Sequence, residues 1–101
     1  MTVLRLFLSA VAASELDDVV ALLRTDVVPA FSAHPECLGI ELVIADRAGA
    51  DGLVEGGVLT RWTTRVAMEA ALKSVELTAS QERVRRLMRR EPMRLVLEVV
   101  D

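Results

Sequence analysis

The stretch from Leu53 to Leu72 changes its hydrophobic period halfway along, and this change constrains the fold more than any other feature of the sequence. Its first half alternates with the two-residue period of a strand, which places on one face Val54, Gly56, Val58, Thr60 and Trp62. Apolar residues then recur at the three- and four-residue spacing of a helix, at Met68, Ala71, Leu72 and Val75. The sequence therefore predicts a strand and a helix that folds back over it, with the only tryptophan close to the junction.

The remaining elements follow from the same two periods. Further strands are predicted over Val3–Val11, Ile40–Asp46 and Arg94–Val100. One helix should begin with Ser14 as its N-cap and kink or end near Pro29, and another should run from Thr78 or Ser80 to Arg90. The order β-α-β-β-α-β is the signature of a ferredoxin-like α+β fold, an antiparallel sheet with helices on one face. We expect residues 1–101 to form one such domain.

Composition and charge exclude several classes of protein. Hydrophobic residues make up 52% of the 101 positions and charged residues 27%, so the chain has enough apolar residues for a core. The net charge of −3 argues against a nucleic-acid partner, and no apolar run reaches the roughly 20 residues that span a membrane. Cys37 is the only cysteine, so we expect a mature cytoplasmic protein without an intramolecular disulfide.

Both faces of the first and last predicted strands carry apolar residues. On the first strand, Leu4, Leu6 and Leu8 are opposed by Val3, Phe7 and Val11. On the last, Leu95, Leu97 and Val99 are opposed by Val96 and Val100. Helices on one side would leave the other face as a large apolar patch, which soluble monomers avoid. We therefore expect a homodimer in which two sheets stack face to face.

Three short segments of the chain read HPECLGIELV, VLTRW and EAALKS. Together they resemble the antibiotic-biosynthesis-monooxygenase (ABM) family of dimeric α+β barrels, whose pattern runs roughly P-G-C-L-G-Y-E-L, then a strand ending in Trp, then a helix like E-A-L-x-A-H. The first match covers Pro35–Leu42, with Glu36 where glycine is usual. The second is Trp62, and the third is Glu69–Ser74, without the histidine that is common in that helix.

The resemblance also implies a chemistry. It implies oxidation of an aromatic, polyketide-like substrate by molecular oxygen without metal, haem or flavin, in a dry pocket where the deprotonated substrate itself reduces oxygen. Polyketide-oxidising relatives use Asn and Tyr beside the tryptophan, and haem-degrading relatives use an Asn–Trp–His set. This chain contains no Asn and no Tyr. What carries over is Trp62 and an arginine of the following helix such as Arg83, with no cofactor expected.

Trp62, His34 and Arg83 form the predicted catalytic set, and the first two have a second interpretation. Trp62 is either a pocket wall that stacks on a planar substrate or a core anchor between strand and helix. His34 is the only histidine and hence the candidate for proton transfer, but it precedes Pro35 in a turn, where histidines are often merely solvated. The predicted apolar walls of a pocket near Trp62 are Phe7, Phe31, Met68 and Leu72.

The roles of several other ionisable residues also have more than one interpretation. Cys37 is expected to be a small buried hydrophobe rather than a nucleophile, and one His with one Cys is too few for a metal site. Arg5, Arg94 and Glu98 share a strand face with Phe7 or Val96. If that face looks into the dimer, these charges form either interfacial ion pairs or a polar lining for an anionic or phenolic ligand.

Two functions therefore remain at the level of the sequence. In the first, a small cofactor-independent monooxygenase-like protein binds and oxidises a small hydrophobic or aromatic molecule near Trp62. In the second, the chain is a non-catalytic ligand-binding or dimerisation module of the same fold. A ring-sized cavity beside Trp62 with a polar group reaching into it would favour the enzyme, whereas a tightly filled interior there would favour the module.

Overall fold

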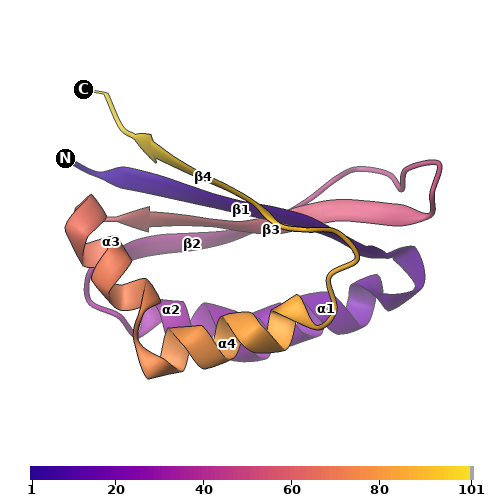
Figure 1. Cartoon of the computed structure of the whole chain (residues 1–101), viewed down its shortest axis with the longest axis horizontal. Helices are drawn as coiled ribbons and strands as arrows, with labels where there is room; N and C mark the ends of the chain where they lie inside the picture. Colours follow the sequence, from indigo (N-terminus) through magenta and orange to yellow (C-terminus); the bar gives the residue numbers. More distant parts are fainter. Residues whose placement is uncertain (101) are drawn as a thin grey trace.

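A four-stranded antiparallel sheet carries the helices on one face and leaves the other face bare (Figure 1). The computed structural model describes residues 1–100. In chain order the elements are β1 (Val3–Ala12), the 3₁₀ turn η1 (Ala13–Glu15), α1 (Leu16–Leu22), the π-helical η2 (Leu23–Val27), α2 (Val28–Ser32), β2 (Cys37–Ile44), β3 (Leu53–Trp62), α3 (Arg65–Leu72), α4 (Val75–Arg85) and β4 (Met93–Glu98). The strand order β2-β3-β1-β4 confirms the predicted ferredoxin-like α+β fold.

The register of the strands decides which side chains face the helices. Across β1 and β3 the helix-facing pairs are Val3–Trp62, Arg5–Thr60 and Phe7–Val58. On β4 the residues opposite Val3, Arg5 and Phe7 are Glu98, Val96 and Arg94. The face that carries Arg5 and Arg94 therefore packs against the helices. It does not look into a dimer, and the interfacial ion pairs considered from the sequence have no basis in this register.

The bare face of the sheet carries the alternate residues of the same strands. Its apolar members on β1, β3 and β4 are Leu4, Leu6, Leu8, Leu59, Met93, Leu95 and Leu97. The three on β4 are each between 43% and 50% exposed. The expectation that one apolar face would remain uncovered by helices is confirmed.

One long helical run, from η1 to α2, crosses the sheet (Figure 1). Pro29 has no N–H to donate to the carbonyl four residues earlier, and the wider π turns of η2 lie directly before α2, in which Pro29 sits near the start. The helix therefore changes its winding and continues to Ser32, instead of ending at the proline. Ser14 is not the N-cap that the sequence suggested, because it lies inside η1 and its side chain caps neither η1 nor α1.

The second helical region consists of two helices, α3 and α4, each capped by a hydroxyl. The Thr64 Oγ1 accepts the Ala67 N–H at 3.1 Å, and the Ser74 Oγ accepts the Leu77 N–H at 3.3 Å. The predicted start of α4 at Thr78 or Ser80 is wrong, because Ser74 provides an earlier cap. The helix also ends at Arg85, before the predicted end.

The β2–β3 hairpin begins earlier than the sequence suggested. Cys37 already pairs with Trp62, across an irregularity in the register between Cys37 and Gly39, so β2 starts three residues before the predicted Ile40. At the far end of the hairpin, Gly52 has a φ of +78°, a conformation that favours glycine. The loop that joins β2 to β3 thus contains a glycine in a conformation that other residues rarely adopt.

Candidate functional site

Two small cavities lie between the sheet and the helices. Their volumes are about 50 Å³ and about 30 Å³. They share the side chains of Phe7, Leu23, Val58, Val84 and Met88. Each is too small for an aromatic ring, since a cavity of about 150 Å³ is needed to hold benzene.

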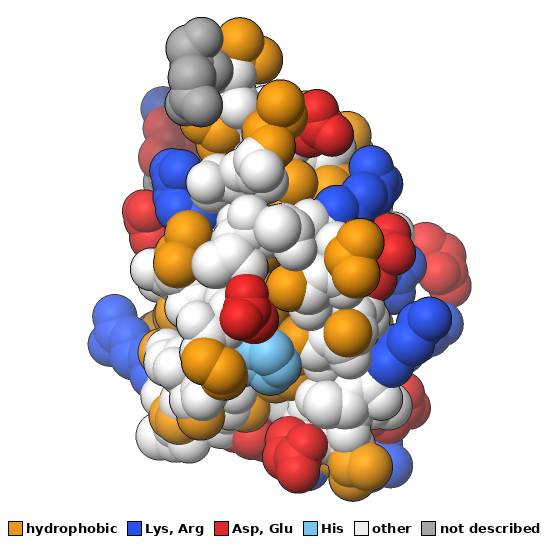
Figure 2. All heavy atoms as spheres, turned by 90° about the vertical axis from the view of Figure 1, so that its left-hand side faces the viewer, with side chains coloured by type: hydrophobic (Ala, Val, Ile, Leu, Met, Phe, Trp, Pro, Cys, Tyr) orange, Lys and Arg blue, Asp and Glu red, His pale blue; other side chains and the backbone are white. Residues whose placement is uncertain are grey.

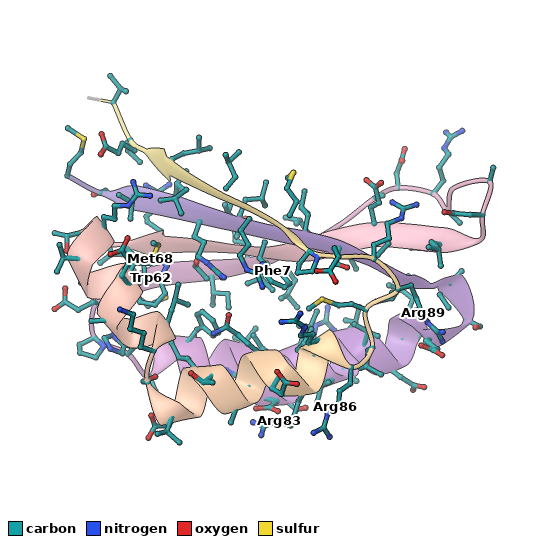
Figure 3. The ribbon with its side chains drawn as sticks, viewed as in Figure 1. Phe7, Trp62, Met68, Arg83, Arg86 and Arg89 are labelled. Carbon is teal, nitrogen blue, oxygen red and sulfur yellow. The ribbon has the colours of Figure 1, made fainter. Side chains whose placement is uncertain are left out.

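A third, outer cavity lies beside the smaller of these two and opens between α4 and the edge of the sheet. Its volume is about 240 Å³, and it shares Phe7, Gln81 and Met88 with the 30 Å³ cavity. Its other walls include Leu72, Thr78 and polar side chains of α4 and β4. Phe7 lines all three cavities, and in Figure 3 it lies midway along the sheet, above α4.

Phe7 is held where β1 and β3 approach each other closely. A Cβ atom on Gly57 would lie 1.7 Å from the carbonyl oxygen of Phe7, so only glycine fits at this position of β3. Two guanidinium groups lie near the ring: the Cζ of Arg5 is 5.4 Å and the Cζ of Arg94 is 5.3 Å from the Phe7 ring centroid. Both distances are within the range of a cation–π contact.

Arg5 is the charged side chain that the fold buries. It is only 6% exposed and lines the 30 Å³ cavity. No carboxylate among residues 1–100 forms an ion pair with it. Burial, and secondarily the positive charge of Arg94, lowers the pKa of the Arg5 guanidinium below its usual value. The cavity thus contains a buried positive charge that no carboxylate of residues 1–100 compensates.

Trp62 is packed as a core anchor. It is 0% exposed, its Nε1–H donates to the Thr60 Oγ1 at 2.8 Å, and its ring meets the edge of the Phe31 ring at a centroid distance of 6.1 Å. The Thr60 hydroxyl in turn donates to the carbonyl oxygen of Arg5 at 3.5 Å. None of the cavities described above is lined by Trp62 or by its neighbour in the core, Met68.

His34 lies at the outer side of Trp62. The two ring centroids are 5.9 Å apart in an edge-on arrangement, and the Nδ1 of His34 accepts the Glu36 N–H at 3.3 Å. Figure 2 shows the imidazole at the molecular surface, at the end of the molecule where α3 begins. The hydroxyl of Thr63 donates to the carboxylate of Glu36, so the glutamate found where ABM sequences usually have glycine ties the turn to the end of β3.

Arg83 lies on the outer side of α4, away from the sheet (Figure 3). Its guanidinium pairs with Asp26 of η2, with 2.8 Å between the Arg83 Nη2 and the Asp26 Oδ1, and the Ser80 hydroxyl also donates to this carboxylate. The hydrogen bonds from Arg83 lower the pKa of Asp26, and the same contact raises the pKa of Arg83.

The structure thus brings together only part of the predicted site. Trp62 and His34 are in contact, but Arg83 lies apart from them on the opposite side of the helical layer (Figure 3). Among the predicted walls, Phe7 and Phe31 line the 30 Å³ cavity and Leu72 the outer one, whereas Met68 is core. Sequence reasoning missed Gln81, although it lies four residues after Leu77, three before Val84 and seven before Met88, which is the spacing of one helix face.

Other kinds of site find no support in the part of the chain that the structure describes. Residues 1–100 contain no group of three or more His, Cys, Asp or Glu side chains placed to hold a metal ion. None of the helices in this range is long and apolar enough to cross a membrane. The thiol of Cys37 is partly buried, which raises its pKa and makes it a poorer nucleophile.

Comparison with known proteins defines the class of this fold. No protein-family profile and no curated protein sequence matches the chain. Among solved structures, Rv0793 from Mycobacterium tuberculosis is similar over 100% of this chain and 97% of its own, with a TM-score of 0.74 and 22% identity. A protein named antibiotic biosynthesis monooxygenase is similar over 100% of both chains, with a TM-score of 0.76 and 17% identity.

A further similar structure is that of a mutant enzyme. It is a single-substitution mutant of SnoaB, a cofactor-independent oxygenase from Streptomyces nogalater. The similarity covers 99% of this chain and 94% of the SnoaB chain, with a TM-score of 0.69 and 19% identity. The fold is therefore a ferredoxin-like α+β domain. More specifically, the chain has the fold of antibiotic biosynthesis monooxygenases over its whole length, as the resemblance of its three short segments predicted.

Proposed function

We propose that this protein binds a small hydrophobic or aromatic molecule between the sheet and α4, at Phe7. The observation that supports this proposal is that the Phe7 side chain lines three separate cavities. The outer cavity, at about 240 Å³, exceeds the roughly 150 Å³ that holds benzene. The ligand therefore enters beside α4, and its apolar part contacts Phe7, Leu72 and Met88.

Calorimetric titration with naphthalene-2-methanol, a neutral aromatic probe, tests this proposal. The variant Thr78→Phe places a ring in the outer cavity and is expected to abolish binding, because Thr78 lines that cavity. The variant Glu76→Phe adds the same ring at an exposed position of α4 that lines none of the cavities and is expected to bind as the wild type does. Equal binding by the two variants would contradict the proposal, and so would a wild type that binds neither this probe nor the corresponding carboxylate, 2-naphthoate, at millimolar concentration.

A second candidate function is cofactor-independent oxygenation of the bound molecule. It is supported by the fold shared with SnoaB, itself a cofactor-independent oxygenase. The candidate catalytic residues are Trp62, His34 and Arg83, but none of them lines the cavities at Phe7, the indole N–H is already bonded to Thr60, and Arg83 is paired with Asp26. The filled interior at Trp62 favours the alternative, a ligand-binding module without this chemistry.

Oxygen uptake with a panel of anthrones and hydroquinones separates these two candidates. An oxygenase is expected to consume oxygen with at least one substrate, and Trp62→Phe, which keeps an aromatic ring in the core, is expected to lower the rate. Uptake by neither protein across the panel would leave the module as the function for these substrate classes.

We also propose that the protein is a homodimer through the bare face of the sheet. Support comes from the apolar side chains of β1 and β4 on that face, which no helix covers in residues 1–100. Leu6→Glu is expected to give a folded monomer in sedimentation velocity, whereas Val75→Glu, at an exposed site on α4, is expected to remain dimeric. A wild-type monomer at micromolar concentration would refute the dimer.

We propose a cytoplasmic location as well, because the single thiol of Cys37 is compatible with a reducing compartment.

A further inference from the structure

Arg5 is the most unusual residue of the interior. Charged side chains are almost never buried without a partner, because removing a charge from water is costly unless an opposite charge compensates it. Arg5 is 6% exposed and has no ion-pair partner among residues 1–100. The other guanidinium at the Phe7 ring belongs to a second arginine, Arg94, so the local charge around this ring is positive.

The strand that carries Arg5 is fixed in place, so the guanidinium cannot leave the interior without cost. The backbone of Arg5 pairs with Thr60 on β3 and with Val96 on β4, in the middle of the sheet. The Thr60 hydroxyl, itself bonded to Trp62, donates to the carbonyl oxygen of Arg5. The side chain points into the layer of Leu23, Val27 and Phe31, where it lines the cavity of about 30 Å³.

The sizes of the two neighbouring cavities suit the two parts of an amphipathic ligand. The 30 Å³ cavity at Arg5 has room for a group of a few atoms but not for a ring. The 240 Å³ cavity beyond Phe7, Gln81 and Met88 has room for a ring. Its charged walls are two arginines and one glutamate, Arg85, Arg94 and Glu82, so positive charge extends to the opening although the whole chain has a net charge of −3.

We propose that the ligand is an aromatic or apolar carboxylate, bound with its carboxylate against Arg5 in the inner cavity and its apolar body in the outer cavity. A guanidinium presents two parallel N–H donors that match the two oxygens of a carboxylate. The carboxylate supplies the negative partner that Arg5 lacks. This inference rests on the proposed binding function, and it adds the class of ligand and the residue that selects it.

The test compares two probes that share the naphthalene ring and differ in charge, 2-naphthoate and naphthalene-2-methanol, in calorimetric titrations of the intact protein at neutral pH. Wild type is expected to bind the carboxylate at least about tenfold more tightly than the alcohol, since hydrogen bonds to charged groups are the stronger ones. Arg5→Met keeps an apolar chain of similar length and is expected to lose this preference while still binding the alcohol. Arg61→Met removes an exposed arginine of the bare face and is expected to keep the preference.

Thermal unfolding supplies a second readout, which does not depend on the heat of ligand binding. Replacing an unpaired buried charge by methionine is expected to raise the melting temperature of the unliganded protein. Millimolar 2-naphthoate is expected to raise the melting temperature of the wild type and of Arg61→Met, but not of Arg5→Met.

The outcomes separate this inference from the binding function on which it rests. If the wild type binds neither probe, the binding function itself fails. If it binds both probes with equal affinity, or if Arg5→Met retains the preference for 2-naphthoate, the binding function stands and the role assigned to Arg5 is overturned. A preference for the carboxylate that disappears in Arg5→Met alone supports the inference.

Discussion

At Trp62 the layer between sheet and helices is filled, whereas at Phe7 the same layer contains cavities. Both residues lie on the helix-facing side of adjacent strands, and both are aromatic. The indole is 0% exposed, with its N–H bonded to Thr60 and with Phe31 and His34 against its ring. The phenyl ring instead borders three cavities and contacts two guanidinium groups.

The difference bears on the two alternatives that the sequence left for Trp62, pocket wall and core anchor. The Trp62 end supplies cohesion, because its polar atom is satisfied and its surroundings leave no room for a ligand. The Phe7 region has spare volume and an uncompensated charge, both of which a stable core avoids. We infer that a bound molecule lies at Phe7, one strand away from Trp62, the residue that matches the ABM motif.

The largest expected effect is the loss of stability when Trp62 is truncated. Trp62→Ala is expected to lower the free energy of unfolding by about 3–5 kcal/mol, because it leaves a large cavity in a filled region. Phe7→Ala is expected to cost about 2 kcal/mol, since this half-buried side chain already borders empty space. Urea unfolding at one fixed protein concentration measures both values. Equal losses would remove the distinction between the two regions.

A smaller effect is expected from adding one methylene group to each region. Val3→Ile, next to Trp62 in the core, is expected to lower the free energy of unfolding by about 1–3 kcal/mol through overpacking. Val84→Ile, which lines both inner cavities, is expected to raise it by about 0.8 kcal/mol through burial of the added group. The comparison is contradicted if the two substitutions change stability in the same direction, as measured by urea unfolding.

The smallest effect concerns the ion pair that holds α4 against η2, outside the region of the cavities. Because contact with Arg83 lowers the pKa of Asp26 in the folded state, this pair stabilises the protein above the pKa of an unfolded aspartate and is lost as pH falls through the folded value. Asp26→Asn is therefore expected to lose less stability than wild type between roughly pH 5 and pH 2. Thermal unfolding across this range measures it, with Asp17→Asn, an aspartate of α1 outside this ion pair, as the control.

The order of elements and the bare apolar face were predictable, because the strand and helix periods and the apolar residues on both faces of β1 and β4 can be read from short stretches of the sequence. The covered face of β1 was not predictable in this way, since Val3 and Phe7 on one side are as apolar as Leu4 and Leu6 on the other. That choice follows from the handedness of the crossover between strands, a property of the whole fold. It decides that Arg5 lies under the helices.

The separation of the predicted catalytic set has a similar origin. Trp62 and Arg83 both belong to correctly identified regions, but the side of α4 on which Arg83 lies depends on where that helix begins and how it packs on η2. A start at Ser74 turns Leu77 and Ser80 inward and leaves Arg83 beside Asp26. The spacing of apolar residues in α4 indicates which residues face the sheet, but it does not say which residue of η2 an outward arginine will meet.

The burial of Trp62 has a spectroscopic consequence. The chain has one tryptophan and no tyrosine, so its intrinsic fluorescence comes from a single site. The indole is 0% exposed with its N–H bonded inside the protein, so its emission should be blue-shifted in the native state and move to longer wavelength when the core opens. Unfolding can therefore be followed at one defined position without a label.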